Sequence, residues 1–191
     1  SKALYRGLAY DLEKDLTPIA LLGTVPHALI VHPSLPAKSV KELIALARER
    51  SGQLTVASAG VGATDHIAAE IFAAMAQVKY LHVPYKGTGP ALVDLVSGQV
   101  AAIFASMPSA VPYVRNGRVR CLAVTGAKRA EVMPEIPTIA ESGLPGYEMT
   151  TWYGIMFPAG TPREIVARMN TEINRVIGLP DVRERLAAVG A

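Results

Sequence analysis

The sequence predicts an α/β fold with mainly parallel sheets, and three observations support this. Short apolar runs at 54–58, 80–85 and 100–106 each lead through a loop of small residues into a helical pattern. The runs are nearly continuous, which is typical of strands that helices cover on both faces. Hydrophobic residues make up 50% of the 191 residues and charged residues 18%, which suits a packed core and argues against disorder.

A strand and a helix precede the first of these runs. The segment PHALIVHPSLP (26–36) has an apolar centre between prolines and indicates a short strand or a crossover segment. The segment 39–52 predicts a helix, because Ser39 and Glu42 form a capping box and Gly52 suits the C-terminal end.

Three strand–loop–helix units follow. The run at 54–58 leads through AGVGA into a helix at 64–76. The run at 80–85 leads through KGTG into a helix that we expect to begin at Pro90. The run at 100–106 leads through MPS into a short helix that ends near RNG, and a strand, RCLAVT, comes next. This alternation predicts βαβ crossovers.

The region after this strand is richer in turn formers. The segment 133–148 contains several prolines and glycines and a capping box of Thr138 and Glu141. The chain then continues with an extended segment, an amphipathic helix and a short helix, at 149–162, 161–178 and 179–190.

This order of elements predicts two lobes of unequal completeness. Residues 26–149 hold the elements of a complete α/β lobe (lobe 2). Residues 1–25 and 150–191 are expected to be remnants of another lobe (lobe 1). The extended segments near 26–33 and 150–157 would connect the two lobes.

Composition excludes several function classes. The net charge of +3 is scattered, without the basic stripe and interleaved aromatic residues of a nucleic-acid interface. Cys121 is the single cysteine, so it forms neither an intrachain disulfide nor a cysteine-rich metal site, and we expect a small buried hydrophobe on a strand. No apolar stretch reaches membrane-spanning length, and no signal peptide is recognisable.

The loop at 58–64 is the first candidate site. In open α/β sheets, ligands bind beyond the carboxyl ends of the strands, where helix N-termini offer unpaired amides and a partial positive charge. A tight turn with Thr64 or Asp65 as a plain helix cap accounts for the same residues equally well. The groups that can contact an anion are hydroxyls and amides of Ser58, Gly60, Gly62, Ala63 and Thr64.

Two neighbouring loops have the same character. Tyr85 offers a flat face and a hydrogen-bond donor, Lys86 a positive charge and Thr88 a hydroxyl. Ser106 and Ser109 add hydroxyls after the third run, so the three strand ends can form a shallow polar bowl. A turn with a solvated lysine accounts for the second loop by itself.

Neither glycine-rich loop is a nucleotide motif. After Gly60 and Gly62, the third position of a dinucleotide fingerprint is Asp65, and no acidic residue follows at 80–85. The phosphate-binding motif GxxxxGK[ST] is absent from the sequence.

Catalytic and metal motifs are missing as well. The sequence has no GxSxG elbow, and its four histidines do not form an HExxH pattern. His66, in the first turn of the loop helix, can donate to a ligand or hydrogen-bond a neighbouring loop, and we favour the structural role. His82 is expected to be a satisfied strand histidine. Trp152 can wall a cleft or pack at a hinge.

Five motifs appear in a characteristic order, namely SAGVGATDHIAAEIF, HVPYKGTGPALVDLVSGQV, LAVTGAKR, PEIPTIAESGLPGYE and WYGIMFPAGTP. This series closely resembles the substrate-binding receptors of tripartite tricarboxylate transporters, also called the Bug family, over essentially the whole chain. The resemblance implies a type II periplasmic-binding-protein fold whose two lobes close like a Venus flytrap. It implies no enzymatic activity and no cofactor.

The resemblance also implies a location, a ligand class and a partner. Family members are periplasmic receptors for di- or tricarboxylates, amino acids or aromatic acids, and they deliver the ligand to membrane permease subunits. Ala105 and Ser106 offer no counter-charge for an amine, which weakly favours a plain carboxylic acid over an amino acid.

Site residues are carried over from the family's loop motif, SAGxG[TS][ST]xHL. This chain matches it at Ser58, Gly60, Gly62, Thr64 and His66. It departs at Ala63, where a common hydroxyl is missing but the amide remains. The ligand-binding residues expected from the resemblance and the residues together are Ser58, Gly62, Ala63, Thr64, Tyr85, Lys86, Gly87 and Thr88, with Ser106 as a distal selector and Trp152 as a cleft wall.

The same resemblance implies that the chain is truncated at both ends. Family members begin with a signal peptide and a βα portion that has its own carboxylate loop, and they end in a further tail. We therefore expect an incomplete lobe 1, a ligand site that lacks half of its clamp, and self-association through exposed lobe 1 surfaces.

Two rival functions stay open at this stage. An α/β hydrolase or transferase would use Ser58 or Ser106 as nucleophile with His66 as its base. An interaction module that binds no ligand would use the same fragment as a docking surface.

Overall fold

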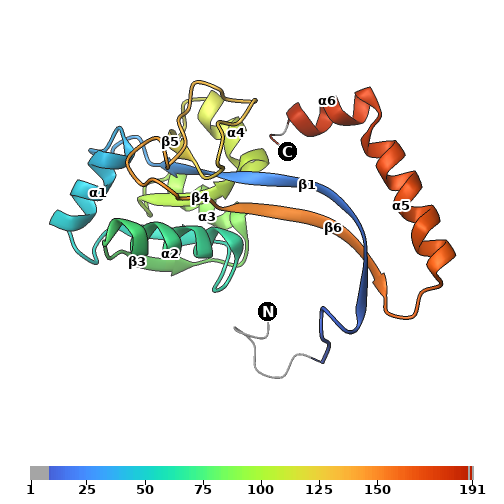
Figure 1. Cartoon of the computed structure of the whole chain (residues 1–191). Helices are drawn as coiled ribbons and strands as arrows, with labels where there is room; N and C mark the ends of the chain where they lie inside the picture. Colours follow the sequence, from blue (N-terminus) through green and yellow to red (C-terminus); the bar gives the residue numbers. More distant parts are fainter. Residues whose placement is uncertain (1–8, 189, 191) are drawn as a thin grey trace. The chain divides into compact units, whose positions relative to one another are not determined.

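The computed structural model describes residues 9–188 and 190, which belong to two compact units (Figure 1). One unit contains Val25–Thr151, and the other contains the described residues up to Thr24 together with Trp152–Ala188. The strands β1 (Leu16–Val31) and β6 (Thr150–Pro158) pair with each other and have residues in both units. Among the described helices, none combines the length and the apolar character that a membrane span requires.

The unit Val25–Thr151 alternates strands and helices as the sequence predicts. Its three strand–helix units appear in the expected order, and the strand RCLAVT follows them. After β1, the elements are α1 (Val40–Glu49), β2 (Thr55–Ser58), α2 (Thr64–Ala76), β3 (Leu81–Pro84), α3 (Thr88–Val96), β4 (Ala102–Ser106), α4 (Met107–Arg115) and β5 (Arg120–Val124).

The sheet of this unit has the strand order β3-β2-β4-β1-β5. The strand β2 is parallel to both β3 and β4, as βαβ crossovers require. The strand β1 is antiparallel to β4 and to β5. Four of these five strands therefore run in one direction, which agrees with the sequence-based prediction. The sequence did not predict the reversed strand β1 between them.

Two hydrophobic clusters lie on opposite faces of the sheet, because alternate strand residues point to opposite sides. Leu29 and Phe104 join the cluster with residues of α1 and α2. Ile30 and Ile103, the next or preceding residues on the same strands, join the cluster with residues of α3 and α4. The unit is therefore a three-layer α/β/α sandwich. Cys121 on β5 packs against the second cluster, and burial raises the pKa of its thiol to about 12.

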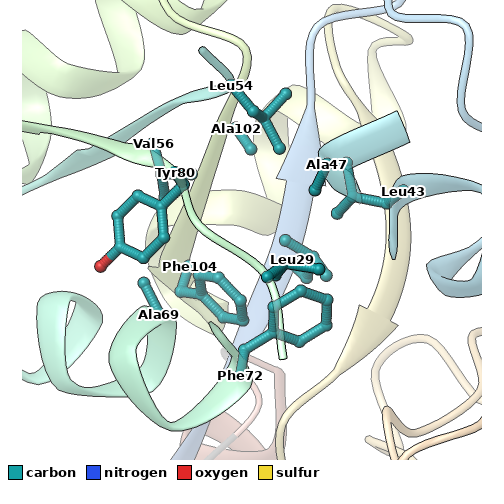
Figure 2. A pocket seen from close by; sticks show the side chains of 11 residues that line it. Leu29, Leu43, Ala47, Leu54, Val56, Ala69, Phe72, Tyr80, Ala102 and Phe104 are labelled. Carbon is teal, nitrogen blue, oxygen red and sulfur yellow. The ribbon is translucent and has the colours of Figure 1, made fainter. Parts of the chain in front are cut away.

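A small cavity of about 20 Å³ remains between α1, α2 and the sheet (Figure 2). Leu29, Phe72 and Phe104 are among the apolar side chains around it. The hydroxyl of Tyr80, which also lines the cavity, donates to Glu70 instead. The space is about the size of one water molecule but lacks the polar partners that a buried water needs, so it is a packing gap in the core.

Helix starts differ from the predictions at two places. The helix α3 begins at Thr88 because Gly87, with φ +117°, turns the chain immediately before it. Pro90 thus lies inside the first turn, where its missing N–H has no intrahelical acceptor in any case. The helix α4 begins at Met107 directly after β4, so the segment MPS is its first turn and not a loop.

One of the two predicted capping boxes forms completely. At the start of α1 the Glu42 amide donates to Ser39 Oγ at 3.2 Å, but the Glu42 carboxylate accepts the Lys38 amide at 2.6 Å and not the Ser39 amide. Thr138 and Glu141 bond reciprocally, at 2.8 and 3.0 Å. The second box supports only a turn, because Gly143 and Gly146 soon follow with positive φ.

The other unit combines parts of β1 and β6 with α5 (Arg163–Ile177) and α6 (Pro180–Ala188). The Asn170 side chain of α5 donates to the carbonyl oxygen of Ile19 at 2.6 Å. None of the residues of α5 is buried. Large apolar side chains that stay exposed in this unit include those of Leu21, Trp152, Tyr153, Ile165 and Val176.

Candidate functional site

The candidate loops follow three strands that end at the same edge of the sheet. Ser58 lies opposite Pro84 in the parallel pairing of β2 with β3. Ala57 lies opposite Ile103 in the pairing of β2 with β4. The ends of β2, β3 and β4 therefore bring Ser58, the loop after Pro84, and Ser106 to one edge, where α/β sheets hold ligands.

The loop between β2 and α2 uses most of its polar groups internally. The Gly60 amide donates to Ser58 Oγ at 3.2 Å, and the Ala63 amide donates to the Gly60 carbonyl at 3.2 Å. The Gly62 amide donates to Nδ1 of His66 at 3.1 Å. The amides of Gly62 and Ala63, which the sequence assigned to a ligand, are thus engaged within the loop.

Asp65 holds this loop against the helix. Its side chain is only 3% exposed, and its two carboxylate oxygens accept the amides of Ala59 (2.7 Å) and His66 (2.9 Å). Ala63 occupies the N-cap position without a side-chain bond, and the helix begins at Thr64. Thr64 is therefore the first helical residue and not the side-chain cap that the sequence suggested.

Two backbone hydrogen bonds tie the second loop to the first. The Tyr85 amide donates to the Ser58 carbonyl, and the Gly87 amide donates to the Ala59 carbonyl, both at 2.9 Å. The Tyr85 hydroxyl donates to Asp94 at 2.6 Å. Burial and then this hydrogen bond raise the pKa of Tyr85 to about 12. Tyr85 and Gly87 thus fix the loops in place and do not offer these donors to solvent.

Three residues at the sheet edge keep donors available. Thr64 and Lys86 are exposed and Thr88 is half-buried. Among residues 9–188, no hydrogen bond involves the side chain of Thr64, Lys86 or Thr88. The backbone amides of Thr64 and Thr88 also have no acceptor in these residues. Since Thr64 and Thr88 open α2 and α3, their amides point out of the helix ends and carry partial positive charge. Two helix N-termini and one ammonium group can therefore receive an anion here.

The third loop contributes less. Ser106 is half-buried at the end of β4, and its hydroxyl donates to the hydroxyl of Ser109 at 3.1 Å. The Ser109 hydroxyl can still donate a hydrogen bond to an acceptor outside the protein. Trp152, by contrast, lies on β6 in the other unit, with 59% of its surface exposed.

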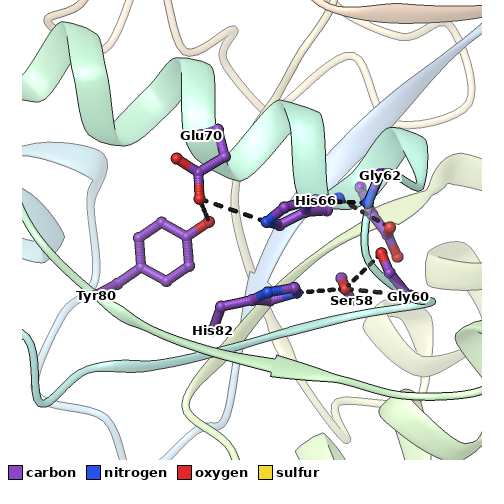
Figure 3. Close-up of polar contacts among 8 residues, drawn as sticks. Ser58, Gly60, Gly62, His66, Glu70, Tyr80 and His82 are labelled. Carbon is purple, nitrogen blue, oxygen red and sulfur yellow. Dashed lines mark hydrogen bonds and ion pairs between the residues drawn. The ribbon is translucent and has the colours of Figure 1, made fainter. Parts of the chain in front are cut away.

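A stacked pair of histidines lies behind the first loop (Figure 3). The rings of His66 and His82 have centroids 3.9 Å apart and planes inclined by 15°. His82 Nε2 lies 2.6 Å from Ser58 Oγ. His66 Nε2 lies 3.4 Å from Oε1 of Glu70, which also accepts the Tyr80 hydroxyl at 2.7 Å. Both histidines are thus bonded into the scaffold, as the sequence suggested.

The serine–histidine pairing of the rival enzyme is not present. His66 bonds Gly62 and Glu70, not a serine. Ser58 pairs with His82, but its side chain is only 1% exposed and cannot reach a substrate. Among the residues that the structure describes, no group of three or more His, Cys, Asp or Glu side chains could hold a metal ion.

Sequence reasoning missed how strongly buried polar groups organise this edge. Asp65 was considered as a plain helix cap, whereas the structure buries it and bonds it to the Ala59 amide as well as to α2. Glu70 and Tyr80 were not singled out at all. The available signal was the spacing of His66 and Glu70, which are four positions apart and so lie on one face of α2.

The whole chain is similar to known proteins. The family model described as "Tripartite tricarboxylate transporter family receptor" matches residues 2–191. A UPF0065 protein from the tcbD-tcbE intergenic region of a Pseudomonas species is 43% identical over 187 residues, which are 97% of this chain and 56% of that protein. BugT of Bordetella pertussis is 35% identical over 99% of this chain and 58% of its own length.

Solved structures show the same similarity. An R. palustris protein with adipate is 40% identical with a TM-score of 0.91, covering 97% of this chain and 62% of that one. MatC from Rhodopseudomonas palustris with bound malate is 37% identical with a TM-score of 0.87, covering 98% of this chain and 64% of that one. The chain thus spans a little over half the length of these relatives.

Proposed function

Because this chain belongs to the family of tripartite tricarboxylate transporter receptors, we propose that its strand-end loops bind one carboxylate of a small organic acid. The observation that carries the proposal is a pair of helix N-termini, at Thr64 and Thr88, with Lys86 beside the second. Each helix follows one of the two loops, and backbone hydrogen bonds join these loops to each other. Amides, hydroxyls and an ammonium group are the donors that a carboxylate accepts.

The ligand class follows from chemistry and from the relatives. The available donors suit a plain anion, and no described carboxylate is free at these loops for an amine, because Asp65 accepts two amides. Two relatives hold the dicarboxylates adipate and malate. A dicarboxylate would place one end on Thr64, Lys86 and Thr88. Ser106 and Trp152 remain proposed contacts for the rest of the ligand.

The biological role is proposed for the longer protein. In the periplasm, a receptor of this family would close two lobes around the acid and present it to membrane permease subunits. The unit Val25–Thr151 would be one lobe, and the other unit would be part of the second. This chain alone would bind weakly if the part of its relatives that it does not span also contacts the ligand.

A substitution at Thr64 tests the role of its amide. Ala63 has φ −66° and ψ 160°, the region that a residue before proline prefers, and proline is tolerated at the first helical position. Thr64→Pro therefore removes the amide donor while preserving the helix. Thr64→Ala is the matched control, because it removes only the hydroxyl.

Titration calorimetry with adipate measures the difference. A hydrogen bond to a charged group contributes about 1.5–3 kcal/mol, so Thr64→Pro is expected to weaken adipate binding about 10- to 100-fold. Thr64→Ala is expected to weaken it less. Equal affinities for the two variants would argue against an anion at this helix end.

A further inference from the structure

The hydrogen-bond partners of His66 determine which of its ring nitrogens carries the proton. The Gly62 amide can only donate, so Nδ1 of His66 is unprotonated and the ring proton sits on Nε2, facing Glu70. Ser58 Oγ lies 3.1 Å from the Gly60 carbonyl and 2.6 Å from His82 Nε2, so its one hydrogen serves either of these two acceptors. With one ring proton, His66 is neutral and both of its nitrogens have a partner.

An additional proton on His66 can bind only at the ring nitrogen that carries none. It must enter Nδ1, the atom that accepts the Gly62 amide at 3.1 Å. Two donors would then face each other, and that hydrogen bond would be lost. The Gly62 amide would be released, and the new Nδ1–H would become a second donor beside it. A carboxylate is an acceptor that can take both.

A carboxylate lies beside His66, and several titratable groups surround the histidine pair. Glu70 lies 3.4 Å from His66 Nε2 and also accepts the Tyr80 hydroxyl, and Asp65 precedes His66 on the same helix. Burial and then the neighbouring His66 lower the pKa of His82, which Glu70 and Asp65 partly offset. Two protonated rings with centroids 3.9 Å apart would repel each other, so the pair takes one proton before the other.

We propose that His66 is a positioning residue of the loop at 58–64, and that its protonation releases the Gly62 amide to a bound carboxylate. Carboxylate binding and proton uptake then favour each other, because coupling between two sites is reciprocal. The affinity for a carboxylate therefore rises when His66 takes up a proton. The carboxylate half of this inference rests on the proposed function, whereas the link between His66 and Gly62 does not.

Two measurements test the inference between about pH 6 and pH 8, where carboxylates are ionised and an ordinary histidine titrates. The first follows the ¹H–¹⁵N signal of Gly62 and the ring signals of His66 in the ligand-free chain. The second measures adipate affinity and proton uptake by calorimetry. His66→Asn is the test variant, because an amide oxygen can accept from Gly62 without titrating. His32→Asn is the matched control, because the His32 ring bonds Ser34, away from the loop.

The expected result is that the Gly62 amide signal and the His66 ring signals move together as the pH changes. Adipate binding should take up protons, and its affinity should fall with rising pH by up to about tenfold per pH unit, the limit for one proton. Both pH dependences should persist in His32→Asn and disappear in His66→Asn.

Three outcomes separate this inference from the proposed function. A Gly62 amide signal that does not move together with the His66 ring signals overturns the inference, whether or not adipate binds. An unchanged pH slope of adipate affinity in His66→Asn also overturns it. Absence of adipate binding at every pH, with Gly62 still following His66, rejects the proposed function for this chain and supports the positioning role of His66.

Discussion

The carboxylate of Asp65 accepts a hydrogen bond of 2.7 Å from the backbone amide of Ala59, six residues earlier in the chain. The same side chain accepts the His66 amide at the start of α2, so one buried acid joins the end of β2 to the helix. The geometry of the candidate loop therefore depends on a residue that does not face the proposed ligand.

Replacing this acid should destabilise the unit measurably. In Asp65→Asn, an NH₂ group replaces one of the two accepting oxygens and faces a backbone donor. The free energy of unfolding is expected to fall by about 1–3 kcal/mol, the cost of leaving a buried donor unsatisfied. Urea denaturation measures the change. Glu148→Gln removes an exposed carboxylate and should change the free energy by no more than about 0.5 kcal/mol. Equal effects of both substitutions would refute the role of Asp65.

A second long-range contact should behave in a similar way. The buried Tyr147 donates to the Ala68 carbonyl at 2.9 Å and so fixes the segment after β5 to α2. Tyr147→Phe is expected to lower the free energy of unfolding by about 1 kcal/mol, since it removes one hydrogen bond and keeps the ring. Tyr113→Phe is the control, because the Tyr113 ring packs against the core and its hydroxyl bonds no other described residue. Chemical denaturation measures the free energy of unfolding of both variants. A larger decrease for Tyr113→Phe than for Tyr147→Phe would contradict the role given to the Tyr147 hydroxyl.

His27 should make stability depend on pH. It is buried on β1, with Nδ1 2.8 Å from the Phe104 carbonyl and Nε2 2.9 Å from the Thr151 hydroxyl. Burial lowers its pKa, against smaller opposing effects of the Phe104 hydrogen bond and of Asp65. The unfolded chain therefore binds more protons than the folded one below the ordinary histidine pKa of about 6.5. Stability is full above that pH and is lost as the pH falls below it.

The variant His27→Gln isolates this contribution. Glutamine offers a donor and an acceptor but does not titrate, so wild type should exceed the variant in stability by more at about pH 8 than at about pH 5. Urea unfolding at both pH values measures the two differences. A difference that stays constant with pH would show that His27 does not titrate in the way its burial requires.

Local sequence patterns predicted the α/β elements because their signals are local. The capping box of Ser39 and Glu42 and the apolar run at 54–58 specify a helix and a strand without reference to distant residues. The place of β1 between β4 and β5 was not predictable, because strand order depends on contacts between distant segments. The start of α3 depended on the φ angle of Gly87, which the sequence allows but does not require.

The candidate site was predictable to the level of loops but not of individual donors. The sequence indicated the loops after β2 and β3, and these two loops are bonded to each other at one edge of the sheet. It could not show that the Gly62 and Gly87 amides are already engaged, because this depends on side-chain rotamers and on backbone contacts between loops. Whether Thr64, Lys86 and Thr88 bind a ligand stays a prediction.

The most direct test of the central claim is a titration of the ¹⁵N-labelled chain with adipate, followed by ¹H–¹⁵N correlation spectra up to tens of millimolar ligand. The account predicts saturable shifts that are largest for the amides of Thr64, Lys86 and Thr88. Succinamide, which is uncharged, should leave these signals in place. An absence of saturable shifts at these three amides, or equal shifts with succinamide, would contradict the claim that this sheet edge binds a carboxylate.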